Sequence, residues 1–186
     1  MSILRIAFTG HRPNKLGGYD WYNPKNHKIR TKLFNTIADT MVSSKEHDFM
    51  FISGGALGVD QFAFDVVNYI KPIVCDKYNV QNIIAVPFKD QPNAWFNKDD
   101  INRYKEQLKQ ADRVIYVDEL DEYRRTSTPK GRYSPQKLQI RNAYMVDNCD
   151  ILIAVWDGSN SGTGNCVHYA KHKGVKIIQI NPKEVK

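Results

Sequence analysis

The sequence predicts an α/β fold, a doubly wound and mostly parallel sheet with helices on both faces. Short apolar runs rich in Ile, Val and Phe alternate with longer segments whose apolar residues have helical spacing. The runs are nearly continuous rather than alternating, which is typical of strands covered on both faces of a parallel sheet. A chain of 186 residues that is 41% hydrophobic suits one buried core, so we expect a single domain over residues 1–186.

Six strand-length runs follow one another along the chain, and five helix-length segments separate them. The runs are ILRIAF (3–8), FMFIS (49–53), NIIAVPF (82–88), RVIYV (113–117), ILIAVW (151–156) and KIIQI (176–180). The segments with helical spacing are roughly 26–45, 59–71, 98–111, 135–148 and 163–173. Right-handed crossovers between parallel strands make this an open sheet, whose ligands bind outside the carboxyl ends of the strands.

Two of the helical segments carry further signals. The second places Phe62, Val66 and Ile70 on one face, as a helix that covers a sheet requires. The fourth begins with Ser134 and Pro135, which are favoured as N-cap and first helical residue. We therefore expect both segments to be helices packed on the sheet.

Composition excludes several classes of protein. Cys75, Cys149 and Cys166 are odd in number and have no CxxC spacing, so we expect neither a disulfide framework nor a metal site, and a reducing, cytoplasmic environment. The first apolar run is too short for a signal peptide, and no run approaches the roughly 18 apolar residues that span a bilayer, so no membrane partner is expected. A net charge of +7 favours anionic partners, either phosphate ligands or nucleic acid.

Three loops that follow predicted strands combine Gly with Ser or Thr. They are TGHRP (9–13), SGGALGVD (53–60) and DGSNSGTGNC (157–166). Glycine lets backbone amides approach a ligand, and helix N-termini offer unpaired N–H groups, so loops of this kind at one sheet edge predict an anion site. None has the Lys-Ser/Thr of a P-loop or the GxGxxG spacing of a dinucleotide fold. No ATPase or NAD dehydrogenase chemistry and no cofactor are therefore expected.

SGGALGVD is similar to the glycine-rich loop of the SLOG superfamily, which includes the LOG phosphoribohydrolases and the Rossmann-like part of DprA. The YpsA-like members resemble the chain most. TGHRP, NAWFNKDDINRYKEQLKQAD, RNAYMVDNCDILIAVWDG and SGTGNC follow in the order found in these proteins. The resemblance covers nearly the whole chain and implies a Rossmann-like fold whose pocket accepts nucleotides or their derivatives. SLOG domains in bacterial immune effectors sense ADP-ribose-like signals.

The resemblance to LOG enzymes indicates further residues of the predicted pocket. Arg141 precedes Asp150 by nine residues, the interval at which LOG enzymes place an arginine that lines the catalytic pocket. Gly162 and Thr163 match the GT of the LOG loop PGGxGTxxE, but Cys166 stands in place of its glutamate. Cleavage of an N-glycosidic bond calls for a carboxylate near the sugar, so this departure argues against LOG-like hydrolysis.

Another carboxylate would have to replace the missing glutamate in a hydrolase. The candidates are Asp60, Asp147 and Asp157, and no catalytic residue is assigned among them. Asp60 either contacts a ribose or stabilises the start of its helix. Cys166 is expected to be a packed residue, since the sequence pairs no histidine with it.

The remaining candidates complete a predicted binding site. Arg12 supplies a second cation beside His11. Trp95 and Trp156 are either base-stacking candidates or core aromatics, and packing in the core is favoured for Trp156. The predicted ligand-binding residues are Thr9, Gly10, His11, Arg12, Ser53, Gly54, Gly55, Gly58, Asp60, Trp95, Arg141, Asp157, Ser161, Gly162, Thr163, Gly164 and Asn165.

The segment 121–135 is predicted to be a mobile basic loop. It holds Arg124, Arg125, Lys130 and Arg132 among tyrosines, with Pro129 and Gly131 as turn residues. It serves either as a lid over a phosphorylated ligand, as a contact to a nucleic-acid backbone, or as a solvated surface loop.

Three functions follow from these features. The first is a sensor or sequestering protein for an ADP-ribose-like or other nucleotide-derived molecule, such as a cyclic ADP-ribose isomer. The second is a phosphoribohydrolase that releases the base from a nucleoside monophosphate, and the third is a DprA-like nucleic-acid-binding protein. The resemblance also implies a homo-oligomer, a dimer or a tetramer.

Overall fold

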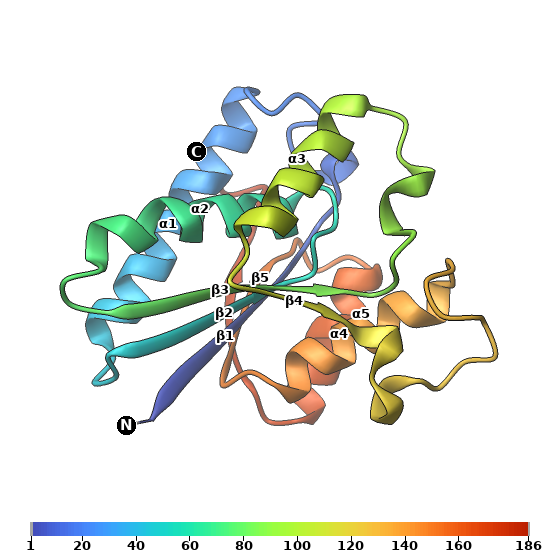
Figure 1. The fold of residues 1–186 in the computed structure, drawn as a ribbon. Coiled ribbons are helices and arrows are strands. Elements are labelled where there is room, and N and C mark those ends of the chain that lie inside the picture. The colour runs from blue at the N-terminus through green and yellow to red at the C-terminus, as the bar shows by residue number, and fades with distance from the viewer. Residues whose placement is uncertain (1, 186) are drawn as a thin grey trace.

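The six predicted strands form one sheet in the order β4-β3-β2-β1-β5-β6, and every neighbouring pair is parallel (Figure 1). This arrangement comes from a computed structural model that describes residues 2–185. The strands are β1 (Ile3–Gly10), β2 (Asp48–Ser53), β3 (Asn79–Val86), β4 (Arg113–Tyr116), β5 (Ile151–Val155) and β6 (Lys176–Ile180). The helices are α1 (Pro24–Ser43), α2 (Val59–Val74), α3 (Lys98–Gln110), α4 (Pro135–Asp147) and α5 (Gly162–His172). The predicted doubly wound fold and its elements are confirmed.

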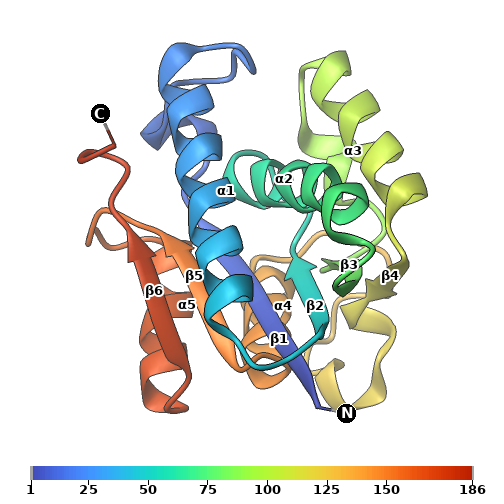
Figure 2. The ribbon, with the colours of Figure 1, turned by 90° about the vertical axis from the view of Figure 1, so that its left-hand side faces the viewer.

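The helices lie on two faces of the sheet. Figures 1 and 2 show α1, α2 and α3 on one face and α4 and α5 on the other. From β1 to β4 each strand is added on the same side, whereas β5 returns to the other side of β1. The strand order therefore reverses between β1 and β5, and α/β proteins bind ligands at this switch point.

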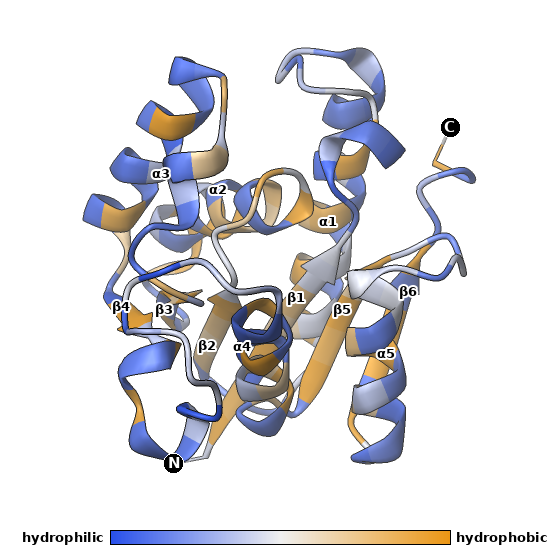
Figure 3. Ribbon diagram, turned by 90° about the vertical axis from the view of Figure 1, so that its right-hand side faces the viewer, coloured by the Kyte–Doolittle hydropathy of each residue, from blue (hydrophilic) through white to orange (hydrophobic). Residues whose placement is uncertain are grey.

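Side chains from the two sides of each strand build two cores. Phe8 and Phe51 stack at 6.0 Å in the core beneath α1 and α2. Ala7 and Ile52, one residue away in each strand, belong to the core beneath α4 and α5. Figure 3 shows the hydrophobic colour concentrated on the strands, with polar residues on the outer sides of the helices. This accounts for the continuous apolar runs in the sequence.

Two glycines bring the start of α2 against the loop after β1. A Cβ atom on Gly10 would overlap the side chain of Val59, and one on Gly58 would lie 2.5 Å from the carbonyl oxygen of His11. Gly58 also has a φ of +93°, which favours glycine. The Val59 N–H donates to the His11 carbonyl at 3.3 Å. Close contact between two of the predicted ligand loops therefore depends on these glycines.

Within residues 2–185, no helix has both the length and the apolar character needed to cross a bilayer. No group of three or more His, Cys, Asp and Glu side chains in the same residues is placed to hold a metal ion.

Candidate functional site

A polar cleft of about 280 Å³ opens at the switch point between β1 and β5. The end of β1, the loop before α2, the helix α4 and the first turn of α5 form its walls. The cleft brings together nine of the predicted site residues: Thr9, Gly10, His11, Arg12, Asp60, Arg141, Ser161, Gly162 and Thr163. It also has walls that the sequence did not indicate, from Asn14, Lys15, Ala56, Leu138, Gln139 and Asn142.

Arg141 and Asp60 form a buried ion pair in the wall of this cleft. The Arg141 Nη1 lies 3.3 Å from Asp60 Oδ2 and also donates to the carbonyl oxygen of Gly54. Nε donates to the side-chain oxygen of Asn142 at 3.0 Å. Asp60 Oδ2 accepts from the Ala56 N–H at 3.3 Å. Nη2 of Arg141 and Oδ1 of Asp60 have no hydrogen-bond partner among the described residues, which leaves them for a ligand.

The first turn of α5 presents free backbone donors to the same cleft. Ser161 is the N-cap, and its Oγ accepts from the Gly164 N–H at 3.1 Å. The Asn165 N–H donates to the Ser161 carbonyl at 2.9 Å. In residues 2–185 no acceptor is found for the N–H groups of Gly162 and Thr163. These two donors and the helix dipole favour an anion at this end of the cleft.

The loop after β5 is held by Asp157. Oδ1 of this residue lies 2.7 Å from Nε2 of buried His11 and accepts from Oγ of Ser159 at 2.5 Å. Oδ2 lies 2.9 Å from Lys183 Nζ, and Lys15 Nζ donates to Ser159 Oγ at 2.6 Å. The hydrogen bond from Ser159, followed by that from Lys183, lowers the pKa of Asp157. His11 and Asp157 therefore fix the loop that leads into the first turn of α5.

Replacing Asp157 by Asn is expected to weaken the dependence of stability on acid pH. Because the folded protein lowers the pKa of Asp157, this carboxylate stabilises the fold above its unfolded pKa of about 3.9, and the contribution is lost as pH falls below about 4. The variant should be less stable than the wild type at pH 7 and lose less stability on acidification.

Urea unfolding at pH 7 and pH 3 measures both differences. Asp39→Asn, an exposed carboxylate on α1, is the matched control. Equal pH dependence in wild type and Asp157→Asn would contradict the role of this loop anchor.

Trp95 lies outside the polar cleft, in a second pocket of about 510 Å³. This pocket is largely apolar, and it includes the exposed rings of Tyr19 and Phe96. Trp95 packs edge-to-face on Tyr104 with ring centroids 5.2 Å apart. Arg12 lines both the polar cleft and the aromatic pocket, so the two form one continuous surface.

The other predicted site residues lie beneath or beside the cleft. Gly54 and Gly55 form the loop behind Arg141, where a Cβ atom on Gly54 would overlap Nη1 of Arg141. Eight predicted residues do not line the cleft: Ser53, Gly54, Gly55, Gly58, Trp95, Asp157, Gly164 and Asn165. Apart from Trp95 in the neighbouring pocket, they belong to the strand ends, loops and helix turns that carry the lining residues.

The structure separates the three carboxylates considered for hydrolysis. Asp60 alone lines the cleft. Asp147 accepts hydrogen bonds from Tyr123 and Tyr169 at the other end of α4. Cys166, where LOG enzymes have glutamate, is buried, and this burial raises the pKa of its thiol to about 11. Trp156 is also buried, as predicted, and donates to the Ser159 carbonyl.

The basic loop after β4 has one short 3₁₀ turn (Asp121–Tyr123) and bends or turns over 124–134. Its second half is anchored by buried Lys137, which donates to Asp118 at 2.8 Å and to the carbonyl oxygens of Pro129 and Arg132. The Gly131 N–H donates to the same Asp118 oxygen. Ser134 is the N-cap of α4, but its side chain makes no capping hydrogen bond.

Comparison with known families agrees with this fold. The family model YpsA, described as the YspA SLOG family, matches residues 6–185. The chain belongs to this SLOG family. The chain is similar to an uncharacterized SPbeta prophage-derived protein, YoqJ, of Bacillus subtilis (strain 168), with 41% identity over 162 residues. That match covers 86% of this chain and 91% of YoqJ. A UPF0398 protein of Bacillus thuringiensis (strain Al Hakam) is 29% identical over 171 residues. That match covers 91% of this chain and 83% of the UPF0398 protein.

Two solved structures of DNA processing protein A share the fold of this SLOG chain. The protein from Helicobacter pylori, described for its single-stranded DNA binding mode, gives a TM-score of 0.56 at 17% identity. The protein from Streptococcus pneumoniae gives 0.56 at 12% identity. Both matches cover 96% of this chain, but only 65% and 50% of those longer chains.

Proposed function

We propose that this SLOG protein binds a nucleotide-derived small molecule, of the ADP-ribose or cyclic ADP-ribose type, as a sensor or sequestering protein. The main support is that Arg141, whose Nη2 has no partner among the described residues, lines the same cleft as Gly162 and Thr163, whose N–H groups have no acceptor there. A phosphate accepts hydrogen bonds from both. The unpaired oxygen of Asp60 is an acceptor for a ribose hydroxyl.

The aromatic pocket supplies binding energy that the anion site lacks. Micromolar affinity requires about 8 kcal/mol. A helix N-terminus contributes about 0.3 to 1 kcal/mol toward an anion, and each charge-assisted hydrogen bond about 1.5 to 3 kcal/mol. Stacking of a base on Trp95 adds about 0.5 to 1.5 kcal/mol, beyond the apolar area that it buries. A ligand with phosphates in the cleft and a base beyond Arg12 therefore uses both pockets.

The arrangement of the carboxylates favours binding of the ligand over its cleavage. Hydrolysis of an N-glycosidic bond needs a carboxylate to stabilise the sugar cation or activate water. Asp60, the carboxylate in the cleft, is held by Arg141, and the position of the LOG glutamate is a buried thiol. The phosphoribohydrolase alternative would need Asp60 to leave its ion pair.

A thermal-shift screen tests the proposal with AMP, NAD, ADP-ribose and cyclic ADP-ribose isomers. A ligand at about 100 times its dissociation constant stabilises the fold by about 2.7 kcal/mol, which raises the melting temperature by several degrees. Each mixture is then denatured and its small molecules are separated by chromatography. A shift with the ligand recovered intact supports a sensor or sequestering protein, recovery of free base indicates a hydrolase, and no shift with any compound contradicts the proposal.

Single-stranded DNA is the second candidate ligand, because the Helicobacter pylori structure with this fold was described for that binding mode. The charge of +7 and the basic loop with exposed Arg124 and Arg132 are consistent with it. Binding of a labelled oligothymidine, followed by fluorescence anisotropy, should then fall steeply between about 50 and 200 mM salt. Tight nucleotide binding without DNA affinity excludes this candidate.

The predicted dimer or tetramer is checked by light scattering of the purified chain.

A further inference from the structure

The strand β6 lies at one edge of the sheet, and within residues 2–185 it pairs only with β5. The carbonyl oxygen of Ile180 accepts from the Trp156 N–H at 2.9 Å, so it points toward the sheet. Backbone groups alternate in direction along a strand, and the N–H and C=O groups of Ile177 and Gln179 therefore point outward. The strand contains no proline, and Lys176 is its single charged residue. Few of the features that protect edge strands are present here.

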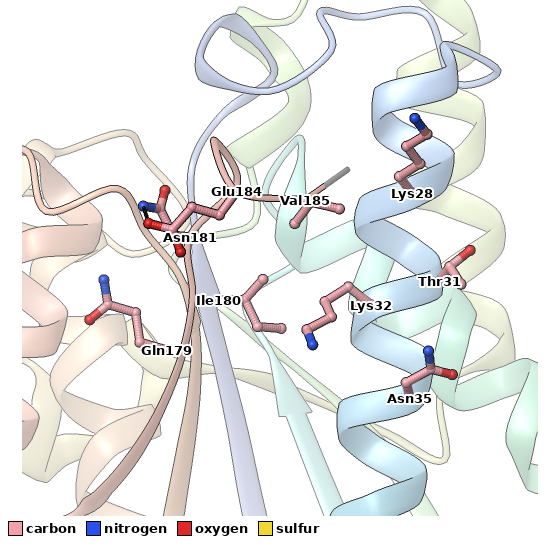
Figure 4. Close-up of a pocket in the computed structure, with 9 residues that line it drawn as sticks. All are labelled: Lys28, Thr31, Lys32, Asn35, Gln179, Ile180, Asn181, Glu184 and Val185. Carbon is pink, nitrogen blue, oxygen red and sulfur yellow. Dashed lines mark hydrogen bonds between the residues drawn. The ribbon is translucent and has the colours of Figure 1, made fainter.

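A groove runs beside this edge, between β6 and α1. One part, of about 520 Å³, lies between Lys32 and Asn35 on α1 and Ile180 on β6 (Figure 4). The next part, of about 480 Å³, continues between Asp39 on α1 and Ile178 on β6. Among the described helices, none covers β6 on this face (Figure 2). A strand added to β6 would place every second side chain on this face of the sheet, along the outer side of the groove.

Two lysines and Glu184 line the upper part of the groove, and the Glu184 carboxylate accepts from the Asn181 side-chain amide at 2.6 Å. Lys28 and Lys32 are exposed, one turn apart on α1, and no carboxylate of residues 2–185 lies within ion-pair distance of either. Figure 4 shows the Lys32 side chain extending from α1 toward Ile180. Four helical residues span about 6 Å. Alternate residues of a strand lie about 6.6 Å apart, so two carboxylates at positions i and i+2 match this spacing.

We propose that β6 is a docking site for an extended acidic peptide of a partner protein, which adds to the sheet as a seventh strand. Its backbone pairs with Ile177 and Gln179, and its alternate carboxylates lie opposite Lys28 and Lys32. The apolar side chains of Ile178 and Ile180 line the floor beneath the other groups that enter the groove.

Charge disfavours a second copy of the chain as the occupant. Antiparallel pairing of β6 with itself over its full length would place the partner copy of residue 176 opposite residue 180. Lys176 lines the same groove as Ile178, so this pairing brings a third cation beside Lys28 and Lys32. Like charges so placed oppose association, and the net charge of +7 adds to the repulsion.

Selection of a displayed library of random 12-residue peptides on the immobilised full chain tests the proposal. Enriched peptides should carry Asp or Glu at positions i and i+2. Amide hydrogen exchange of the complex should slow at Ile177 and Gln179. Lys28→Glu/Lys32→Glu should weaken binding of an enriched peptide at least tenfold, whereas the matched reversal Lys98→Glu/Lys105→Glu on α3 should not. The melting temperature shows that each variant is folded.

Three results would overturn the proposal. One is that no peptide is enriched, and another is that enriched peptides bind equally well to Lys28→Glu/Lys32→Glu. The third is a dimer, in sedimentation of the chain alone, whose β6 amides are already protected from exchange. That last result would assign the edge to a second copy.

Discussion

Replacing Arg141 by Gln is expected to weaken ADP-ribose binding roughly 10- to 150-fold. The variant loses the positive charge and the free Nη2 donor in the cleft. A hydrogen bond to a charged group is worth about 1.5 to 3 kcal/mol, and each 1.4 kcal/mol changes the dissociation constant about tenfold. Isothermal titration at fixed ionic strength measures the change, and Arg124→Gln in the exposed loop is the matched control.

The ion pair requires a second variant, because Arg141→Gln leaves the buried carboxylate of Asp60 without its cation. Removing one partner of a buried pair destabilises a protein by about 3 to 5 kcal/mol. Asp60→Asn/Arg141→Gln removes both charges and restores a neutral wall. If both variants bind ADP-ribose weakly and the double variant melts near the wild-type temperature, the loss of affinity comes from the missing ligand contact and not from unfolding. Unchanged affinity in a folded variant would contradict the role of Arg141.

The elements of the fold were predictable because each strand is a continuous apolar run. ILIAVW and KIIQI give β5 and β6, whose bounds differ from prediction by at most one residue. The order of the strands had no such local signal. It depends on the crossing of α4 to the opposite face of the sheet, which is determined by how the helix layers pack on the sheet.

The site was predictable to the extent that loops after parallel strands meet at one edge. That rule is sufficient to bring Arg12, Asp60 and Thr163 together in one predicted site, and all three line the cleft. The pairing of Asp60 with Arg141, separated by 81 residues, had no sequence signal, and neither did Gln139 as a wall of the cleft. Such contacts depend on how far a side chain extends from one helix toward residues of a helix on the opposite face of the sheet.

The anchor of the basic loop had no sequence signal either, because a lysine in a helix usually indicates an exposed face. Lys137 and Asp118 are each only 4% exposed. Lys137 bonds Asp118 and two loop carbonyls, while Oδ1 of Asp118 is buried without a partner among the described residues. The pair connects the end of β4 to α4, the helix that carries Arg141.

Replacing Lys137 by Met should therefore destabilise the protein by about 3 to 5 kcal/mol, since it leaves the Asp118 carboxylate buried without a cation. Urea unfolding measures the loss, and hydrogen exchange should accelerate at Gly131, whose N–H donates to Asp118. Asp118→Asn/Lys137→Met should be more stable than Lys137→Met, because no unpaired charge is left. Lys105→Met, at an exposed position of α3, is the matched control and should change stability by less than about 0.5 kcal/mol. A loss below about 1 kcal/mol for Lys137→Met would mean that water reaches Asp118, and that the basic loop is held by other contacts.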